Sequence, residues 1–490
     1  MTTTTTTTTT TTPTSPQGHG PTSGRDTRWL ALVVIAVAQL MVALDATIVN
    51  IALPSAQQGL GFGDADRTWV VTAYTCTLAG LLLLGGRVAD RFGRRRAFLV
   101  GLAGFAAASA LAGLAPDLGT LVAGRALQGC FAAILTPTAL SLVATTFTDP
   151  RERARAFGVY GAVASSGAAV GLMLGGVLTE YAGWRWCLFV NVAVAVGASV
   201  AGRAVLPRDS GYPDVRLDTA SGALVTTGLV AIVLGCARAA TEGWTSWQVL
   251  VPAAAGVALV AAFLVRQTRI TQPLLPLWVL TDRSRAGAYL AVAVSVVGSF
   301  GMFLMLTYHF QVVLGFTPVQ AGLAFLPLSV AVSGSAYGLG SRLLPHVAPR
   351  MLIAPGLVIA ALGLGLLTTL TPESGYATVI LPSEVLLGLG MGLVFTPAIS
   401  VATSDVEPRY AGVAAATANT ATQIGSSVGT AVLNSVAVAA TASYAAAHGP
   451  SSTALVHGYA TATGWSAGVL AVAAAVVVLV VHTPHPTKES

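Results

Sequence analysis

Long apolar runs separated by short polar loops dominate this sequence of 490 residues. A helix needs about 17 to 25 predominantly apolar residues to cross the hydrocarbon of a bilayer. With 54% hydrophobic and 9% charged residues, the chain has too little polar surface for a soluble fold. The sequence therefore predicts an all-α polytopic membrane protein embedded in a lipid bilayer. Its expected spans lie near residues 29–51, 69–86, 97–116, 118–146, 157–178, 185–206, 219–238, 247–267, 286–312, 319–342, 350–370, 377–403, 410–440 and 460–482.

These fourteen runs fall into groups of six, two and six along the chain. We expect an N-terminal six-helix bundle at 29–206, a C-terminal six-helix bundle at 286–482, and between them a linker at 207–285 whose two extra transmembrane helices pack at the periphery. The Thr-rich segment 1–28 has no basic region followed by an apolar core, so we interpret it as a disordered cytoplasmic tail rather than a signal peptide. A second cytoplasmic tail is expected at 483–490.

The distribution of basic residues predicts the orientation of the spans. With the N-terminus inside, only Arg67, Arg185 and Arg238 fall in external loops, Arg125 falls within a span, and all other Lys and Arg fall on the cytoplasmic side. This asymmetry follows the positive-inside rule and places both termini in the cytoplasm. Because the basic residues lie in short loops rather than on one face or tail, we expect no binding of nucleic acid.

The loop between the second and third predicted spans, Gly86–Arg96, combines five arginines with one acid. Its glycines permit a tight turn and a close approach of helices, and its acid can accept hydrogen bonds from arginines or cap a neighbouring helix. A generic cytoplasmic anchor would need only the arginines. The residues of interest are Gly86, Asp90, Arg91, Gly93, Arg94 and Arg95.

This loop resembles the Gly-x-x-x-Asp-Arg-x-Gly-Arg-Arg signature of the major facilitator superfamily of transporters, with every fixed position filled. Gly338–Arg350, at the corresponding place in the last six spans, looks like a decayed copy in which Arg342 occupies the position of the acid. The resemblance implies the major facilitator fold, in which two six-helix halves enclose a substrate site near the bilayer midplane.

Asp45 lies inside the first predicted span. A carboxylate in hydrocarbon is costly, so it should face the bundle interior, pair with a cation or carry a proton. The stretch Leu44–Pro54 resembles the first-helix signature of the fourteen-helix drug:proton antiporter family, and this resemblance implies a role in proton coupling. A static cap or ion pair stays open as the alternative.

Arg125 lies in Gly124–Gly129, which resembles the fourth-helix motif of the superfamily with its intramembrane Arg and Gln. Arg125 and Asp45 each lie about seven residues, or roughly 10 Å, from the outer ends of their spans. We therefore predict that Arg125 tunes or exchanges with protonated Asp45, directly or through Gln128. The alternative is a structural Arg bonded to backbone carbonyls.

Glu384 is the other intramembrane acid, in the twelfth predicted span. We interpret it as a second proton-coupling site, with the alternative that it lies close enough to a helix end to reach water. Three histidines, His309, His448 and His457, lie at or beyond outer helix ends and are interpreted as incidental.

The fifth predicted span carries small residues at helical spacing. It resembles the antiporter motif of exporters in this superfamily, although Leu172 stands where the family usually has proline, which leaves the kink of that motif in doubt. A plain packing face of small residues would explain the same pattern. The motif residues are Gly167, Gly171, Gly175 and Gly176.

Five polar residues within or at the edges of apolar spans are candidates for contacts with substrate in a mostly apolar cavity. Each could equally form a hydrogen bond between helices. They are Tyr74, Gln128, Tyr308, Asn419 and Gln423.

No Gly-x-x-x-x-Gly-Lys-[Ser/Thr] motif, catalytic dyad or metal-binding cluster occurs in the sequence, so we expect neither an enzyme nor a bound cofactor or metal. The four cysteines lie singly in apolar runs, as packed thiols do. Together with the resemblance to the fourteen-helix drug:proton antiporter family, this implies a proton-coupled antiporter, functional as a monomer, that exports small amphipathic drugs or natural products across a bacterial inner membrane. A transporter of one metabolite with the same fold is the main alternative, and a membrane sensor or enzyme is a further one.

Overall fold

The computed structural model describes residues 23–212, 214–344, 346–403, 406 and 411–481. Within these residues it holds fourteen helices or helix groups long and apolar enough to cross a membrane, which confirms the predicted number of spans. The first eight spans and one short helix are α1 (Ser23–Leu60), α2 (Arg67–Phe92), α3 (Arg94–Gly113), α4 (Leu118–Thr146), α5 (Pro150–Tyr181), α6 (Trp186–Val205), α7 (Thr219–Glu242), α8 (Trp247–Gln267) and α9 (Trp278–Thr281).

The last six spans are less regular than the first eight. The predicted continuous helix at 319–342 is interrupted near Pro327, which lacks a backbone N–H, and then winds into a π-helical stretch, η2. Two further π-helical turns, η1 and η4, adjoin α10 and α15. The segments are α10 (Arg283–Tyr308), η1 (His309–Val313), α11 (Pro318–Ala324), α12 (Leu326–Ser333), η2 (Gly334–Gly340), α13 (Ser341–Leu343), α14 (Arg350–Leu366), η3 (Leu367–Thr369), η4 (Tyr376–Ile380), α15 (Leu381–Thr403), α16 (Ala411–His448) and α17 (Ser452–Val480).

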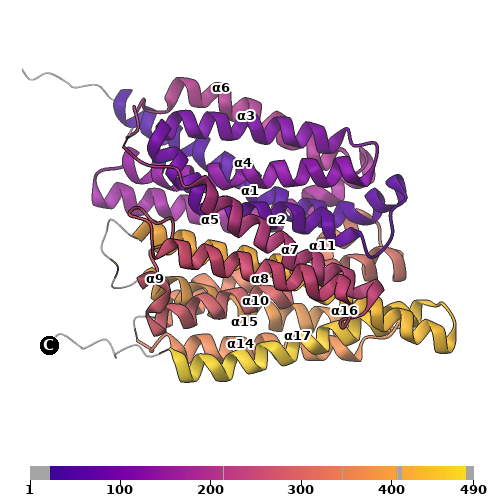
Figure 1. Ribbon diagram of the computed structural model, residues 1–490. Helices are drawn as coiled ribbons and strands as arrows, with labels where there is room; N and C mark the ends of the chain where they lie inside the picture. The colour runs from indigo at the N-terminus through magenta and orange to yellow at the C-terminus, as the bar shows by residue number, and fades with distance from the viewer. Residues whose placement is uncertain (1–22, 213, 345, 404–405, 407–410, 482–490) are drawn as a thin grey trace, which may run out of the picture.

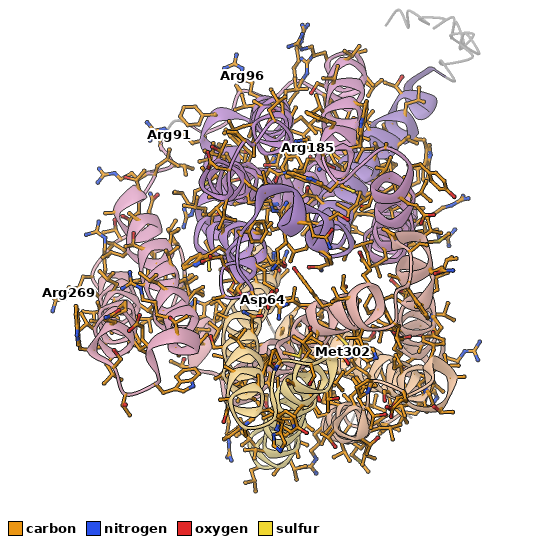
Figure 2. All side chains as sticks on the ribbon, turned by 90° about the vertical axis from the view of Figure 1, so that its right-hand side faces the viewer. Asp64, Arg91, Arg96, Arg185, Arg269 and Met302 are labelled. Atoms are coloured by element: carbon orange, nitrogen blue, oxygen red, sulfur yellow. The ribbon has the colours of Figure 1, made fainter. Side chains whose placement is uncertain are left out.

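The helices run roughly parallel to one axis and pack in two groups (Figure 1). In the first, α2 packs on α4, α1 on α5, and α3 on α4 and α6. In the second, α14 packs on α15 and α17, and α16 on α10 and α17. Seen along the axis, α1–α6 lie on one side and α10–α17 on the other (Figure 2). The groups meet where α2 contacts α16 and where α5 contacts α11.

The extra pair α7–α8 lies outside the two six-helix groups (Figure 2). α7 packs against both α2 and α16 and so lies along one seam between the groups, while α8 packs on α7. The approach is close, because a Cβ on Gly80 of α2 would lie 2.2 Å from Thr226 Oγ1 of α7. On the other side of the seam, Ser435 of α16 donates to the carbonyl of Cys236 in α7.

Asp218 lies outside the spans and caps the N-terminus of α7. Its carboxylate accepts from the backbone N–H of Ser221 at 3.1 Å and from Arg266 Nη2 of α8 at 3.0 Å. Burial opposes ionisation of Asp218, but the hydrogen bonds from Ser221 and Arg266 outweigh it and hold the pKa of this carboxyl below its ordinary value. The start of α7 is thus fixed to the end of α8.

The two ends of the bundle differ in their loops. One end carries the turn at Gly93 between α2 and α3, and we call it the basic-loop end. The other carries the turn between α1 and α2 at residues 61–66, and we call it the opposite end. Figure 2 looks along the bundle and shows Asp64 near the boundary between the two helix groups.

Candidate functional site

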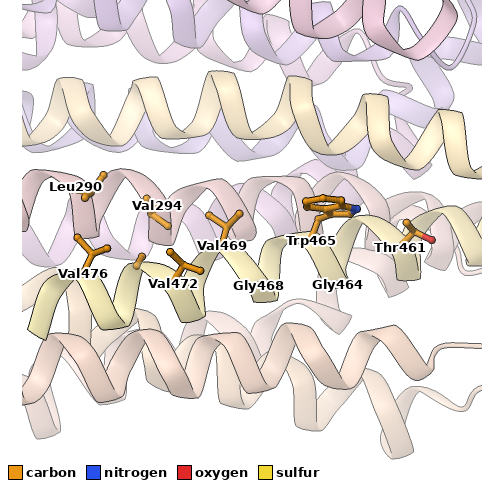
Figure 3. A pocket seen from close by; sticks show the side chains of 10 residues that line it. Leu290, Val294, Thr461, Gly464, Trp465, Gly468, Val469, Val472 and Val476 are labelled. Carbon is orange, nitrogen blue, oxygen red and sulfur yellow. The ribbon is translucent and has the colours of Figure 1, made fainter. Parts of the chain in front are cut away.

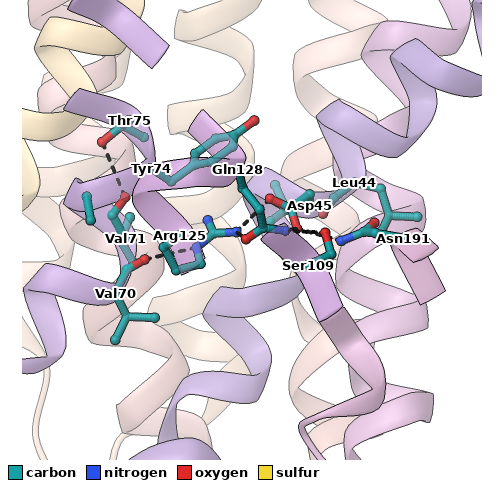
Figure 4. A network of polar contacts seen from close by, with 12 residues as sticks. Leu44, Asp45, Val70, Val71, Tyr74, Thr75, Ser109, Arg125, Gln128 and Asn191 are labelled. Atoms are coloured by element: carbon teal, nitrogen blue, oxygen red, sulfur yellow. Dashed lines mark hydrogen bonds and ion pairs between the residues drawn. The ribbon is translucent and has the colours of Figure 1, made fainter. Parts of the chain in front are cut away.

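Asp45 of α1 is the centre of a buried polar network (Figure 4). Its side chain is 0% exposed. Oδ2 accepts from Arg125 Nη1 at 2.6 Å, and Oδ1 accepts from Gln128 Nε2 at 3.0 Å and from Asn191 Nδ2 at 2.6 Å. Both oxygens therefore have donors, as a charge removed from water requires. The carboxylate joins α1 to α4 and α6.

Arg125 of α4 is equally buried, at 1% exposed. Besides Asp45, its Nη1 donates to Gln128 Oε1 at 2.9 Å, and its Nε donates to the carbonyl of Val70 at 3.1 Å. The guanidinium carbon lies 4.5 Å from the ring centroid of Tyr74, a cation–π contact. The structure thus brings together the two charges that the sequence placed at one depth, and it adds the backbone bond of the structural alternative.

Two members of the network were not identified as site residues from the sequence. Ser109 of α3 accepts from Gln128 Nε2 at 2.7 Å, and Asn191 of α6 bonds Asp45 directly. Both are 0–1% exposed. A serine among alanines in an apolar run carries little signal, whereas an amide within an apolar run, as at Asn191, is a stronger one.

This arrangement changes when a proton is added. Protonation of Asp45 removes the counter-charge of Arg125 and leaves a guanidinium buried without a negative partner. Breaking a buried pair in this way costs about 3–5 kcal/mol, so the helices that hold the two charges must rearrange or admit water. The buried pair is therefore an arrangement in which neutralisation of Asp45 would alter the packing of α1 on α4.

The glycines of α5 set its distance from α1. Added Cβ atoms on Gly167 and Gly175 would lie 2.6 Å and 3.0 Å from side-chain atoms of α1, and one on Gly171 would lie 2.1 Å from Thr47 Oγ1. Gly176, the next residue along, faces the second group instead, and a Cβ on it would lie 2.5 Å from the carbonyl of Pro318 at the start of α11. Along these glycines the backbone of α5 therefore packs directly against α1, which carries Asp45, and against α11 of the second helix group. Leu172 is buried, and α5 continues through it as one helix.

The basic-loop turn is held by a residue from the linker. Gly93 has φ +92°, a conformation that favours glycine. The carboxylate of Asp209 accepts from the backbone N–H groups of Arg94 at 2.7 Å and Arg95 at 3.1 Å, and so caps the start of α3. Asp90 takes no part in this cap, and its Oδ1 lies 4.0 Å from Arg94 Nη2.

The remaining residues of that loop are also placed by the structure. Arg91 Nη1 donates to the carbonyl of Val215 in the linker at 3.0 Å. Gly86 has room for a Cβ, whose nearest neighbour would be Pro137 at 3.7 Å, so the close approach belongs to Gly85 instead. A Cβ there would lie 2.0 Å from the carbonyl of Ala133 in α4.

Glu384 of α15 is 0% exposed, so the alternative that it reaches water is wrong in this conformation. Its Oε2 lies 3.5 Å from the hydroxyl of Tyr376, and Oε1 has no hydrogen-bond partner among the described residues. His309 is also 0% exposed, with both ring nitrogens unpaired within the described part of the chain. The interpretation of His309 as an incidental residue at a helix end missed this burial. The helix does not end there, because the π-helical turn η1 continues from α10 through His309.

A comparison with known protein families shows to which family this architecture belongs. A family model described as "Major Facilitator Superfamily" matches residues 35–430. The chain belongs to the Major Facilitator Superfamily. As a member of this superfamily it is a transporter rather than an enzyme, and the fourteen spans agree with the resemblance to the fourteen-helix drug:proton antiporter family.

Curated relatives of this superfamily align over most of their length. The chain is 50% identical over 451 residues to the puromycin resistance protein of Streptomyces alboniger, covering 90% of this chain and 89% of that protein. It is 38% identical to the cephamycin export protein of Amycolatopsis lactamdurans, over 85% of this chain and 86% of that protein. It is 35% identical to the tetracenomycin C resistance and export protein of Streptomyces glaucescens, over 85% and 77%.

Solved structures confirm the major facilitator fold. A bacterial homolog to the human lysosomal transporter Spinster, in an inward-facing and unoccupied conformation, superposes with a TM-score of 0.67 at 16% identity, over 93% of this chain and 97% of that one. An auto-inhibited POT family peptide transporter gives a TM-score of 0.66 at 18% identity, over 94% and 99%. At sequence identities this low, the similarity supports a shared fold and nothing more.

The candidate cavity residues of this major facilitator protein are not gathered in one place. Tyr74 and Gln128 belong to the Asp45 network. Tyr308 donates its hydroxyl hydrogen to Gln57 of α1 and so bridges the helix groups. Asn419 and Gln423 are half-buried on α16, four residues apart and hence on one face of that helix.

An apolar groove lies elsewhere, between α10 and α17 (Figure 3). Its lining is apolar except for Thr461, and Trp465 is 65% exposed. Such a surface suits contact with lipid chains. It holds none of the candidate residues, so we do not place the substrate there.

Proposed function

We propose that this protein exports small amphipathic drugs or antibiotic-like natural products across the bacterial inner membrane in exchange for protons, as a monomer. The observation that carries the proposal is the fully buried pair of Asp45 and Arg125, whose helices must rearrange when the carboxylate is neutralised. The names of the relatives, which concern resistance to puromycin, export of cephamycin and export of tetracenomycin C, support the class of cargo.

In this mechanism the two six-helix halves, 29–206 and 286–482, rock around a central site. Asp45 takes a proton when the site faces outward and releases it when the site faces inward, and Arg125 re-forms the ion pair after release. The glycine face of α5 lets α1 shift without a side-chain clash. Glu384 is a second proton site in the C-terminal half, because burial of a carboxyl group with one unpaired oxygen suits a protonated group.

We place the basic-loop end, including the cluster at Gly86–Arg96, in the cytoplasm, with both termini on that side. The polar residues Tyr308, Asn419 and Gln423 then approach the cargo as the halves rock. A proton entering down two pH units and 100 mV supplies about 5 kcal/mol. This is enough for several-thousand-fold accumulation of cargo outside, at about 1.4 kcal/mol for each tenfold step.

The proposal is tested by uphill transport in inside-out membrane vesicles that contain the protein. With an acidic lumen, we expect labelled puromycin to accumulate in the lumen, and collapse of the proton gradient by an ionophore should release it. Vesicles carrying Asp45→Asn are the matched control and should equilibrate without accumulation. If puromycin and a panel of other amphipathic antibiotics are not accumulated by the wild type, whereas a polar metabolite is, the proposed cargo class is wrong.

A further inference from the structure

The linker that follows α6 lies against the basic loop between α2 and α3. The carboxylate of Asp209 caps the start of α3, and the backbone N–H of Tyr212 donates to the carbonyl of Asp90 at 2.8 Å. Arg91 Nη1 donates in turn to the carbonyl of Val215 at 3.0 Å. Figure 2 shows Arg91 on the side of α1–α6 that faces the extra pair α7–α8. These contacts attach the linker to the loop at several residues.

The backbones of the linker and the loop approach each other without side chains between them. Gly211 has φ +70°, and a Cβ on it would lie 2.5 Å from the carbonyl oxygen of Arg91 and from the backbone nitrogen of Gly93. A Cβ on Gly93 would likewise lie 2.8 Å from the carbonyl oxygen of Asp209. Only a residue without a side chain allows so close an approach. We call Asp209, Gly211, Tyr212 and Val215 the clasp.

Beyond the clasp, α7 is interlocked with α2. Gly80 of α2 leaves the space that Thr226 of α7 fills, since a Cβ on Gly80 would lie 2.7 Å from the Cα of Thr226. Gly222 of α7 in turn leaves space for Leu84 of α2, whose Cδ2 would lie 2.9 Å from an added Cβ. Each helix thus fills a gap in the other. Sliding along this seam would therefore drive side chains against backbone.

The far end of the extra pair is also tied to the first half. Arg87 Nη2 of α2 donates to the carbonyl of Pro273, which follows α8, at 2.8 Å. Within the pair, Gln267 Nε2 of α8 donates to Ser221 Oγ of α7 at 2.8 Å. The two helices therefore form one unit, which is attached to the first half both where α7 begins and where α8 ends.

The seam between α7 and α16 of the second half is smoother. The nearest neighbours of the glycines of α7 belong to α2 or α8, and those of the described glycines of α16 belong to α10, so no such interlock forms between α7 and α16. Apolar side chains pack here, among them Leu229 of α7 near Ala418 of α16. Between the described residues one hydrogen bond crosses this seam, from Ser435 Oγ to the carbonyl of Cys236.

α7 touches both halves, so one of its two seams must change when the halves move relative to each other. A change at the first seam would break the hydrogen bonds of the clasp and withdraw Thr226 and Leu84 from the spaces that they fill. A change at the second seam would break one hydrogen bond and move apolar side chains past one another. The second seam is therefore the one that gives way.

We propose that the extra pair α7–α8 is carried by the first half during transport, with Asp209 as the residue that positions it, and that α16 slides along α7. The inference rests on the proposed rocking of the two halves. It gives a role to the two helices that stand outside the six-helix bundles: they form a wall fixed to one half, along which the other half moves.

The test measures three distances by electron spin resonance on full-length protein in lipid nanodiscs. The labels occupy exposed positions at the opposite end: Leu114→Cys after α3, Thr245→Cys between α7 and α8, and Glu373→Cys between η3 and η4. They are introduced in pairs into a background that lacks the native cysteines and matches the wild type in transport. Those cysteines are Cys76, Cys130, Cys187 and Cys236.

Two wedge variants separate the halves at this end. Gly176→Trp on α5 cannot keep its contact with α11, because its Cβ alone would lie 2.5 Å from the carbonyl oxygen of Pro318. Gly322→Trp on α11 acts from the other half, because its Cβ would lie 2.5 Å from the carbonyl oxygen of Leu172. A result shared by both variants does not depend on the folding of either one.

We expect both wedge variants to lengthen the distance between labels 114 and 373, which reports the separation of the halves. The distance between labels 245 and 373 should shift with it. The distance between labels 245 and 114 should keep its wild-type distribution, because the extra pair stays with the first half.

Two further variants test the clasp within the wedge backgrounds. Asp209→Ala removes the cap, and Gly211→Val places a side chain where the loop backbone lies. Each should broaden the distribution between labels 245 and 114, whereas a purely local effect on α3 would not change a distance at the far end of the bundle. Asp214→Ala is the matched control, since this exposed acid of the same linker makes no hydrogen bond among the described residues, and it should keep the wild-type distribution.

The outcomes separate the claims. A shift between labels 245 and 114, with the distance between 245 and 373 unchanged, would show that the pair moves with the second half and would overturn the proposal. Equal distributions in Asp209→Ala, Gly211→Val and Asp214→Ala would remove the positioning role of Asp209. Since these distances are measured without cargo or a proton gradient, a lack of proton-driven puromycin transport in the wild type would refute the proposed function alone.

Discussion

Separating the two charges of the central ion pair should destabilise the folded protein far more than removing both. In Arg125→Met the aliphatic stem is kept, but Asp45 loses a hydrogen bond of 2.6 Å and the one ion-pair partner that it has among the described residues. Gln128 and the Val70 carbonyl lose a donor each. An uncompensated buried charge of this kind costs about 3–5 kcal/mol. Asp45→Asn leaves Arg125 unpaired and should cost a similar amount.

The double variant Asp45→Asn/Arg125→Met leaves no buried charge, and Asn at 45 still accepts from Gln128 or Asn191. We expect its free energy of unfolding to fall by less than about 2 kcal/mol. Because the two single losses add to at least about 6 kcal/mol, the coupling free energy of the pair should exceed about 4 kcal/mol. The assay is equilibrium unfolding of purified protein in mixed detergent micelles. Two probes follow the unfolding: the helical content, and the fluorescence of the protein itself measured without ligand. The four proteins of the cycle are measured at one pH.

The matched control cycle uses the partly exposed pair of Asp218 and Arg266, whose atoms lie 3.0 Å apart. Its coupling should fall below about 1 kcal/mol because water screens it. If the effects of Asp45→Asn and Arg125→Met simply add, or if the two cycles give equal coupling, then the central pair is not the buried, mutually dependent unit described here.

Three further variants test separate parts of the account. Gly171→Leu should abolish transport at normal membrane levels because its Cβ alone would lie 2.1 Å from a side-chain atom of α1, whereas Gly158→Ala, with open space at its Cβ, should be active; equal activity would contradict the close contact of α1 and α5. Asp209→Ala should cost about 0.5–2 kcal/mol and speed hydrogen exchange in the first turn of α3, and Arg208→Ala should leave that exchange unchanged; slow exchange in both would show that the cap is unimportant. Glu384→Gln should lower the number of protons exchanged per cargo molecule, and an unchanged ratio would remove this residue from the coupling scheme.

The membrane architecture could be predicted because the bilayer permits few solutions. Backbone groups in hydrocarbon must bond within a helix, so run length alone gave the fourteen spans. The depth of a residue in the membrane follows from its distance in residues to the end of its helix. This count predicted that Asp45 and Arg125 lie at the same depth, and the structure shows them in contact. The division into two halves at 29–206 and 286–482 and the orientation of the spans stay predictions.

Features that depend on tertiary packing could not be predicted from the sequence. Arg67 was assigned to a loop because a charge next to an apolar run ordinarily ends it, whereas partners from α10 and α16 bury it at the start of α2. The place of α7 between α2 and α16 depends on fitted surfaces that no single span reveals. Ser109 became part of the network only through a neighbour on another helix.

The central claim is that Asp45 exchanges a proton for each movement of cargo. The most direct measurement is the pH change inside proteoliposomes, reported by an enclosed dye, when cargo is added without an imposed gradient. We predict a cargo-dependent proton flux with the wild type and none with Asp45→Asn, although the variant still binds cargo. A flux from Asp45→Asn equal to that of the wild type would contradict the account.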